Sequence, residues 1–172
     1  MRILLAVSLL TTPLFAQSLD PQFEAVGDFD GTFGETPIVL KSLFDLEKDR
    51  SMVRVRESGA FTTVSISART IGEDGKPTSP SVSFTIGPIG AGGGGVRADV
   101  TYSDGAGNFV SDNDIGGRVT LSDYEQTETT VSFSIETALQ PIKRGDQGFE
   151  VDDTRASQVI SGTYSGVIKE ID

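Results

Sequence analysis

Short runs in which apolar and polar residues alternate constrain the fold of this chain more than any other feature. Apolar side chains recur at every second position in Val64–Arg69, Val82–Ile86, Val119–Ser122 and Val131–Glu136. In a β-strand, a period of two places the apolar residues on one side and the Ser and Thr residues on the other. The apolar positions are mostly β-branched or aromatic, which suits a half-buried pleated surface. The pattern therefore predicts antiparallel strands with one face on a core.

Glycine and proline punctuate these runs in the way expected of hairpins. Gly72–Pro77 contains Asp-Gly, a strong signal for a tight turn, and Asp104–Asn108 predicts a second turn. The glycine-rich stretch after Ile86 is interpreted as a linker, because neither Lys-Ser/Thr nor a helix pattern follows it. About 155 residues after the N-terminal segment suit one domain. We expect an all-β, antiparallel β-sandwich of about eight to nine strands in a single domain.

Three segments are less regular. Ile38–Lys48 fits either a short amphipathic helix or a strand, and we expect a strand over Thr36–Phe44. Pro141–Arg155 lacks alternation and is predicted to be a long loop, of the kind that often carries function. Val159–Ile168 is predicted to be the closing strand.

The C-terminal third carries a resemblance. The sequences GRVTLSDY at Gly117–Tyr124 and VISGTYSGVI at Val159–Ile168 resemble strands of small secreted bacterial β-sandwich domains of uncharacterised function. The long insert between the two strands departs from that pattern. The resemblance implies a sandwich in an exported protein, and it implies no catalytic residue.

The N-terminus has the features of a secretory signal peptide. Arg2 supplies a positive start, Ile3–Leu10 is almost entirely apolar, and small residues mark a cleavage site after Ala16 or Ser18. The apolar run is too short to span a bilayer, so we expect no membrane anchor after cleavage. The mature domain is therefore expected to begin near residue 17, to extend to residue 172, and to be periplasmic or secreted.

Composition excludes several classes of function. The chain has 14 Lys and Arg against 25 Asp and Glu, so it carries a net charge of −11. Such a chain repels phosphate backbones, and we expect no nucleic-acid partner. It contains no His, Cys or Trp, which removes the usual zinc, copper and haem ligands and the His-dependent nucleophile systems. An outer-membrane barrel is disfavoured, because its strands would need about ten residues and aromatic girdles.

The segment Ser111–Asp123 is the one candidate metal site. Read as a twelve-position calcium loop, it places Asp112 and Asp114 at the first and third positions, Gly117 at the sixth and Asp123 at the last. The fifth position is glycine, and the last is a carboxylate shorter than the usual Glu. The alternative is an acidic turn before a strand, in which Asp and Asn bond their own backbone. Calcium is the only cofactor that the sequence suggests.

Two further motifs are weaker. Arg144, Gly145 and Asp146 form an exposed-loop tripeptide that could be offered to a receptor, although three-residue matches arise by chance. Asp28–Gly31 (DFDG) is predicted to be a turn. The pair Tyr124 and Tyr164 could form an aromatic platform for a ligand, but we expect each tyrosine to anchor a strand. Arg54 and Arg56 alternate with valines, as on the solvated face of one strand.

These observations predict an exported, non-catalytic binding or structural module, with calcium as a possible aid to binding. Three alternatives stay open: a carbohydrate-active domain that uses a pair of carboxylates, a subunit of a surface fibre or adhesin, and an inhibitor that presents Pro141–Arg155 to an enzyme. The sequence names neither a ligand nor a partner, and it leaves the oligomeric state open.

Overall fold

The computed structural model describes residues 18–59, 61–89, 96–111, 118–146 and 148–169. These residues form strands and no helix, and none of them belongs to a helix that could cross a membrane. The strands are β1 (Phe23–Phe33), β2 (Thr36–Asp45), β3 (Arg50–Ser51), β4 (Val53–Ser58), β5 (Phe61–Ile71), β6 (Pro77–Ile89), β7 (Arg97–Ser103), β8 (Asn108–Val110), β9 (Val119–Thr120), β10 (Ser122–Gln126), β11 (Thr130–Gly145), β12 (Gly148–Val151) and β13 (Gln158–Val167).

All strand pairings are antiparallel, and the sheet closes on itself. Its order is β2-β1-β13-β11-β8-β7-β6-β5, and a pairing of Lys41 in β2 with Arg69 in β5 completes the ring. The ring has eight strands. Outside it, β3 pairs with β2, β4 pairs with β5, β9 pairs with β7, and β10 and β12 pair with β11. The fold is thus an eight-stranded barrel with extra strands.

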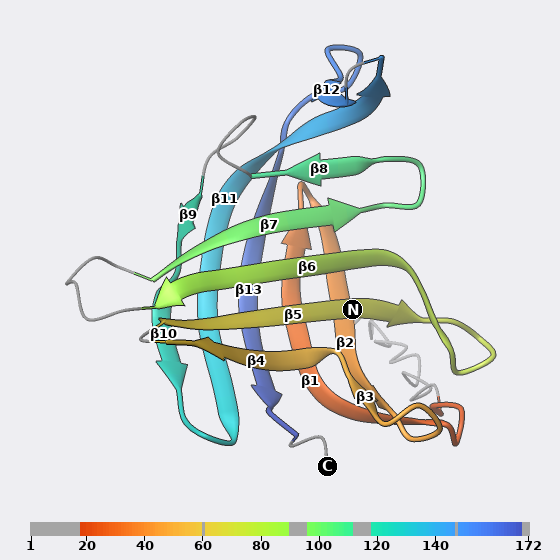
Figure 1. Ribbon diagram of the computed structural model, residues 1–172. Coiled ribbons are helices and arrows are strands. Elements are labelled where there is room, and N and C mark those ends of the chain that lie inside the picture. The colour runs from red at the N-terminus through yellow and green to blue at the C-terminus, as the bar shows by residue number, and fades with distance from the viewer. Residues whose placement is uncertain (1–17, 60, 90–95, 112–117, 147, 170–172) are drawn as a thin grey trace, which may run out of the picture.

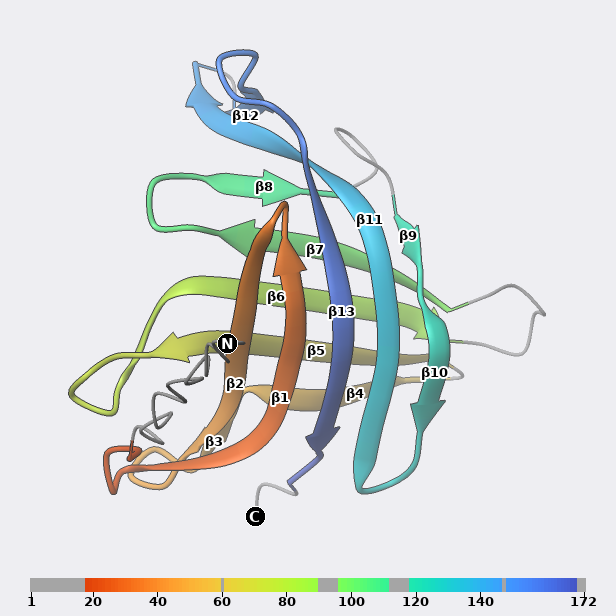
Figure 2. The same cartoon turned by 180° about the vertical axis from the view of Figure 1, so that it is seen from behind.

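The barrel consists of two crossed layers. Figure 1 shows β4 to β8 running across the view, in front of β1, β2, β13 and β11, which run steeply and alternate in direction. Figure 2 shows the steep layer from behind, with the β11–β12 hairpin rising above the rest of the barrel. Crossed layers joined at their corners are one of the two common ways in which sheets pack.

The prediction of an antiparallel all-β domain is confirmed, whereas the prediction of two separate sheets is not. Two short contacts make the difference: β8, which has three residues, bridges β7 to β11, and one residue pair joins β2 to β5. Alternation of side chains is the same in an open and a closed sheet, so the sequence pattern could not distinguish the two. The expected strand over 36–44, both expected hairpin turns and the closing strand are all present.

Aromatic side chains fill the interior of the barrel. Phe84 lies with its ring centroid 5.0 Å from Phe133 and 5.6 Å from Phe29, and Phe133 stacks on Tyr164 at 5.4 Å. All four residues are at most 2 % exposed. Aromatic rings in such tilted and edge contacts contribute about 0.5–1.5 kcal/mol per pair beyond their burial. The interior is therefore a packed core, and the hollow described below lies on the outside.

Candidate functional site

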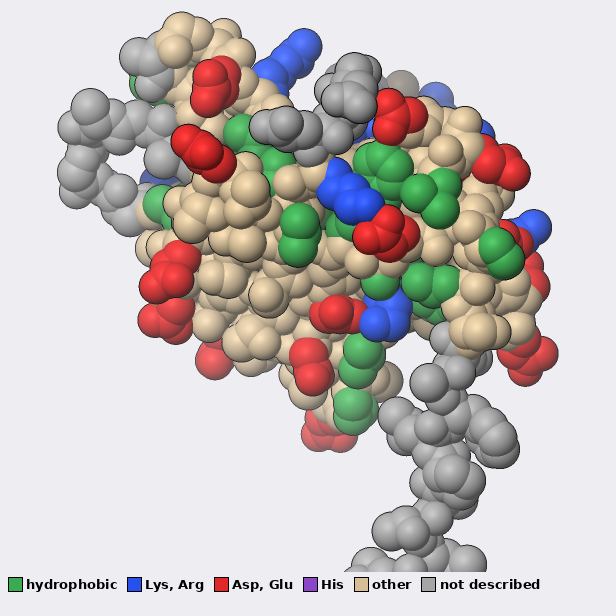
Figure 3. All heavy atoms as spheres, turned by 90° about the horizontal axis from the view of Figure 1, so that it is seen from below, with side chains coloured by type: hydrophobic (Ala, Val, Ile, Leu, Met, Phe, Trp, Pro, Cys, Tyr) green, Lys and Arg blue, Asp and Glu red, His purple; other side chains and the backbone are tan. Residues whose placement is uncertain are grey.

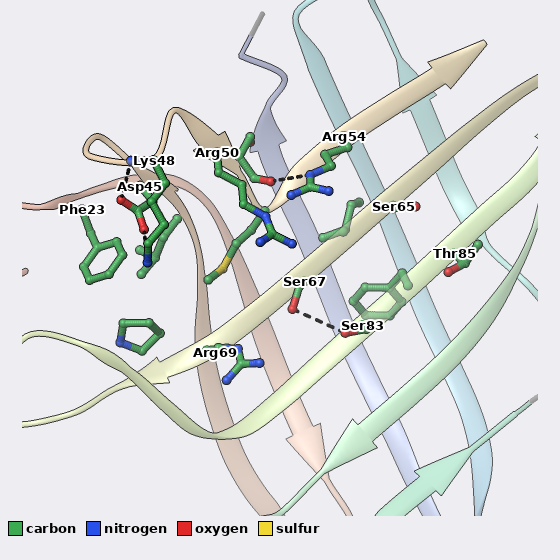
Figure 4. A pocket seen from close by; sticks show the side chains of 16 residues that line it. Phe23, Asp45, Lys48, Arg50, Arg54, Ser65, Ser67, Arg69, Ser83 and Thr85 are labelled. Atoms are coloured by element: carbon green, nitrogen blue, oxygen red, sulfur yellow. Dashed lines mark hydrogen bonds and ion pairs between the residues drawn. The ribbon is translucent and has the colours of Figure 1, made fainter. Parts of the chain in front are cut away.

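A hollow of about 520 Å³ lies on the outer surface of the barrel, above β5 and β6 and beside the corner formed by β2, β3 and β4. We call it the arginine groove. Its rim carries Arg50, Arg54 and Arg69, and its floor carries the hydroxyls of four residues: Ser65, Ser67, Ser83 and Thr85. Figure 4 shows these side chains, with the arginines entering from β3, β4 and β5.

The floor is a direct consequence of strand alternation. In β5, Val64, Ile66 and Ala68 point into the core, so the serines between them point outward. The register pairs Ser65 with Thr85 and Ser67 with Ser83, which places the four hydroxyls side by side on neighbouring strands. The hydroxyl of Ser83 donates a 3.4 Å hydrogen bond to the Oγ of Ser67.

The corner between β3 and β4 positions two of the arginines. The hydroxyl of buried Ser51 accepts a hydrogen bond from the Val53 amide at 3.0 Å, which fixes the bend between the strands. Arg54 donates from Nε to the Ser51 carbonyl, also at 3.0 Å, and this bond directs its side chain along the rim. In the antiparallel register of β3 with β2, Arg50 lies opposite Asp45, the last residue of β2.

The groove is positively charged within an acidic protein. Lys48 also lines the groove. Asp45 is the one acidic residue in the described lining, and its Oδ2 lies 3.3 Å from the Nζ of Lys48. A hydrogen bond from the Gln22 side-chain amide, at 3.0 Å, is the main cause that holds the pKa of Asp45 below its usual value. Asp45 is thus already paired, and four cations in the groove face one carboxylate.

Arg50, Arg54 and Arg69 form no ion pair with any carboxylate in the described part of the chain. Arg56, Arg97 and Arg144 likewise form no ion pair with a described carboxylate, so what distinguishes the groove is that three such arginines line one hollow. Figure 3 shows acidic side chains scattered over one whole face of the molecule, so carboxylates are plentiful elsewhere. Guanidinium groups are rigid forks with five donors that match carboxylate, phosphate and sulfate oxygens. Three of them around one hollow present the hydrogen-bond donors and positive charge that an anion would require.

The predicted calcium site is only partly visible. Asp112 and Asp114 lie outside the described residues. Asp123 lies in β10, is exposed, and adopts a left-handed backbone conformation with φ of 51° at an irregularity in the β10–β11 pairing. Among the residues that the structure describes, no group of three or more acidic side chains is placed to hold a metal ion. Calcium binding at this segment stays a prediction.

The predicted loop over Pro141–Arg155 is instead mostly a hairpin. β11 continues to Gly145, and β12 returns beside it with Gly145 opposite Gly148. Arg144, Gly145 and Asp146 therefore lie at the tip of this hairpin, where Arg144 and Asp146 are exposed. Cross-strand pairs such as Lys143–Glu150, whose charged atoms are 3.5 Å apart, stabilise the hairpin without the apolar alternation that sequence analysis looks for.

The structure overturns the interpretation of Asp28–Gly31 and agrees with the interpretation of Tyr164. Asp28–Gly31 is not a turn but the middle of β1, where Asp28 and Asp30 point outward and Phe29 points into the core. Tyr164 is 1 % exposed and packs against Phe133, so it forms no surface platform with Tyr124. As expected of an anchor, Tyr164 holds its strand to the core.

Sequence analysis missed the arginine groove because its parts are far apart in the chain. Arg50 and Arg54 form a visible local cluster, whereas Arg69 comes from β5, which the β4–β5 register and the β2–β5 pairing bring beside them. A hint existed in the sequence, since β5 and β6 expose serine or threonine at successive outward positions. Without the register, however, that pattern indicates only a solvated face.

Comparison with known proteins gives no assignment, since no family model, no curated protein and no solved structure matches this chain.

Proposed function

We propose that the protein is an exported, non-catalytic binding module that holds anionic ligands in the arginine groove. The observation that carries this proposal is the convergence of Arg50, Arg54 and Arg69, which have no carboxylate partner among the described residues, on one hollow. The protein has a net charge of −11, yet these three cations have no described carboxylate partner. A bound anion would pair with their positive charges.

The chemistry of the groove favours binding over catalysis. Hydrolysis of a glycosidic bond by a carboxylate pair requires two acidic groups that face each other across the substrate. The described lining of the groove contains a single acidic residue, Asp45. Its carboxylate accepts a hydrogen bond from Gln22 and forms an ion pair with Lys48. Arginine side chains and hydroxyl groups supply hydrogen bonds and positive charge, but neither acts as a general base at neutral pH.

A titration with sodium sulfate tests the proposal. The ionic strength is held constant with sodium chloride, and amide chemical shifts of the purified protein are followed by NMR. Shifts are expected to concentrate in β3, β4, β5 and β6, with a dissociation constant on the order of ten millimolar or weaker, since three exposed ion pairs contribute at most about 3 kcal/mol.

Variants of the rim locate the binding. Arg50→Ala and Arg69→Ala remove side chains that make no hydrogen bond or ion pair with other described residues, so the fold is expected to be unchanged. Each should weaken sulfate binding severalfold. Arg56→Ala is the matched control, because Arg56 is an exposed arginine on β4 that does not line the groove. Equal weakening by Arg56→Ala, or shifts spread evenly over the surface, would contradict the proposal.

A further inference from the structure

The cations of the arginine groove are distributed along its length. Arg54 in β4 pairs across from Ser65 in β5, whereas Arg69 lies four residues further along β5. Four residues of a strand span roughly 13 Å. Figure 4 shows Arg54 and Arg69 on opposite sides of the hollow, with Arg50 between them. A ligand that engages all three cations therefore carries more than one anionic group.

The floor between these cations offers hydroxyls and no free backbone. β5 is paired with β4 and β6, and β6 is paired with β5 and β7, so the main-chain donors and acceptors of the floor are used. An added peptide strand would have no edge to pair with at this place. Serine and threonine hydroxyls both donate and accept, as sugar hydroxyls do. The floor is thus suited to a polyhydroxylated ligand.

One end of the groove carries Phe23, as Figure 4 shows. Met52 and Pro77 also line the groove, and all three residues are half-buried, so part of each side chain remains exposed. An aromatic ring offers a broad face on which the C–H face of a sugar ring can pack. Phe23 is the aromatic residue labelled at this end in Figure 4.

We propose that the arginine groove binds an acidic polysaccharide, a chain of sugar units that bear carboxylate or sulfate groups. This inference rests on the proposed function and adds the class of ligand to it. The anionic groups bind the three arginines, the sugar hydroxyls exchange hydrogen bonds with Ser83, Thr85 and their neighbours, and one sugar ring packs on Phe23.

Calorimetric titration of the purified protein with four probes tests the inference. The probes are a short oligomer of galacturonic acid, free galacturonate, a neutral oligosaccharide of the same length, and an acidic peptide of the same charge. Because several anionic groups on one ligand engage several arginines together, the oligogalacturonate should bind at least about tenfold more tightly than free galacturonate. It should also bind more tightly than the neutral oligosaccharide and the acidic peptide.

Changes in the floor separate this inference from the proposed function. Ser83→Ala combined with Thr85→Val should weaken oligogalacturonate binding roughly three- to tenfold, as expected for lost hydrogen bonds, and should weaken sulfate binding by a smaller factor, because the arginines remain. Thr101→Val, on the neighbouring strand β7 and outside the groove, is the control. If sulfate binds in the groove but the oligogalacturonate binds no better than free galacturonate or the acidic peptide, the inference is wrong and the proposed function stands. If neither sulfate nor oligogalacturonate binds, both are wrong.

Discussion

The hydroxyl of Tyr164 donates a 3.0 Å hydrogen bond to the Oγ of Ser42, a residue 122 positions earlier in the chain. Ser42 in turn donates a 2.8 Å hydrogen bond to the carbonyl of Ser67. This buried chain of bonds runs from β13 through β2 to β5, next to the single residue pair that closes the barrel. Because Ser67 also belongs to the floor of the arginine groove, the barrel closure and the site share a residue.

Ser42→Ala should destabilise the protein. The substitution leaves the Tyr164 hydroxyl and the Ser67 carbonyl without this partner, and unsatisfied buried groups cost about 1–3 kcal/mol. Tyr164→Phe should cost less, about 0.5–1.5 kcal/mol, because only one bond is lost. Unfolding in urea measures both. Ser165→Ala, at an exposed position of β13, is the control, and an equal loss of stability in that variant would contradict the account.

Gly27 is expected to tolerate no side chain, because it lies directly against Tyr164. A Cβ atom added at Gly27 would be 2.3 Å from the Tyr164 hydroxyl oxygen and 2.9 Å from the ring carbon that carries it. Gly27→Ala should therefore cost about 1–3 kcal/mol, the range for overpacking a core. Removing the hydroxyl with Tyr164→Phe should recover part of this loss. A double-mutant cycle measures the recovery, and strictly additive effects would show that the two residues do not interact.

Alkaline pH should destabilise the protein through its three tyrosines. Burial raises the pKa of Tyr124 and of Tyr164 to about 12, and burial also raises the pKa of Tyr102 above 10.0. Between pH 10 and 12 the unfolded chain releases tyrosine protons that the folded protein retains. The unfolded state then binds fewer protons, so the free energy of unfolding falls as pH rises.

Absorbance of tyrosinate during a pH titration checks this prediction. No tyrosine of the folded protein is expected to ionise with its ordinary pKa near 10, whereas the urea-unfolded chain should show all three there. A full tyrosine titrating near 10 in the folded state would contradict the described packing.

Arg155 is expected to hold the segment after β12 against the β7–β8 turn. Its Nη2 lies 2.5 Å from Oδ2 of Asp104, and its guanidinium stacks 4.4 Å from the ring centre of Phe109. Partial burial raises the pKa of Asp104, but hydrogen bonds from the Ala106 and Gly107 amides and from Arg155 outweigh it and hold the pKa below its usual value. The carboxylate is thus charged and paired at neutral pH.

Arg155→Ala should cost about 1 kcal/mol, since it removes a partly exposed ion pair and a cation–π contact. Amide hydrogen exchange should become faster around residues 152–157, while sulfate binding stays unchanged. Arg155→Lys keeps the charge and should recover only part of the stability, because lysine lacks the planar fork. Loss of sulfate binding in Arg155→Ala would place the anion site away from the arginine groove.

The local structure was largely predictable from the sequence. Alternation located the central parts of β5, β6 and β11, and Asp-Gly located the turn between β5 and β6. These features are local, because side-chain period and turn chemistry act within a few residues. The hairpin of β11 and β12 was missed because exposed strands outside the core need no apolar alternation.

Closure of the barrel and the arginine groove were not predictable in the same way. Both depend on which strands become neighbours: closure depends on the pairing of Lys41 with Arg69, and the groove also depends on the registers of β5 with β4 and β6. That pairing joins residues 28 positions apart through one contact, and no local pattern in either strand encodes it. Arg69 therefore looked like an ordinary outward residue until its neighbours were known.

The most direct test of the central claim is the affinity of the purified protein for oligogalacturonate and for sulfate in an arginine double variant. Arg50→Ala/Arg69→Ala is compared by calorimetry with Arg56→Ala/Arg97→Ala, which removes the same charge from exposed positions outside the groove. The account predicts that the first pair abolishes measurable binding of both ligands, whereas the second changes it by less than about twofold. Equal binding by the two double variants would show that net charge, and not the groove, governs the interaction, and would contradict the account.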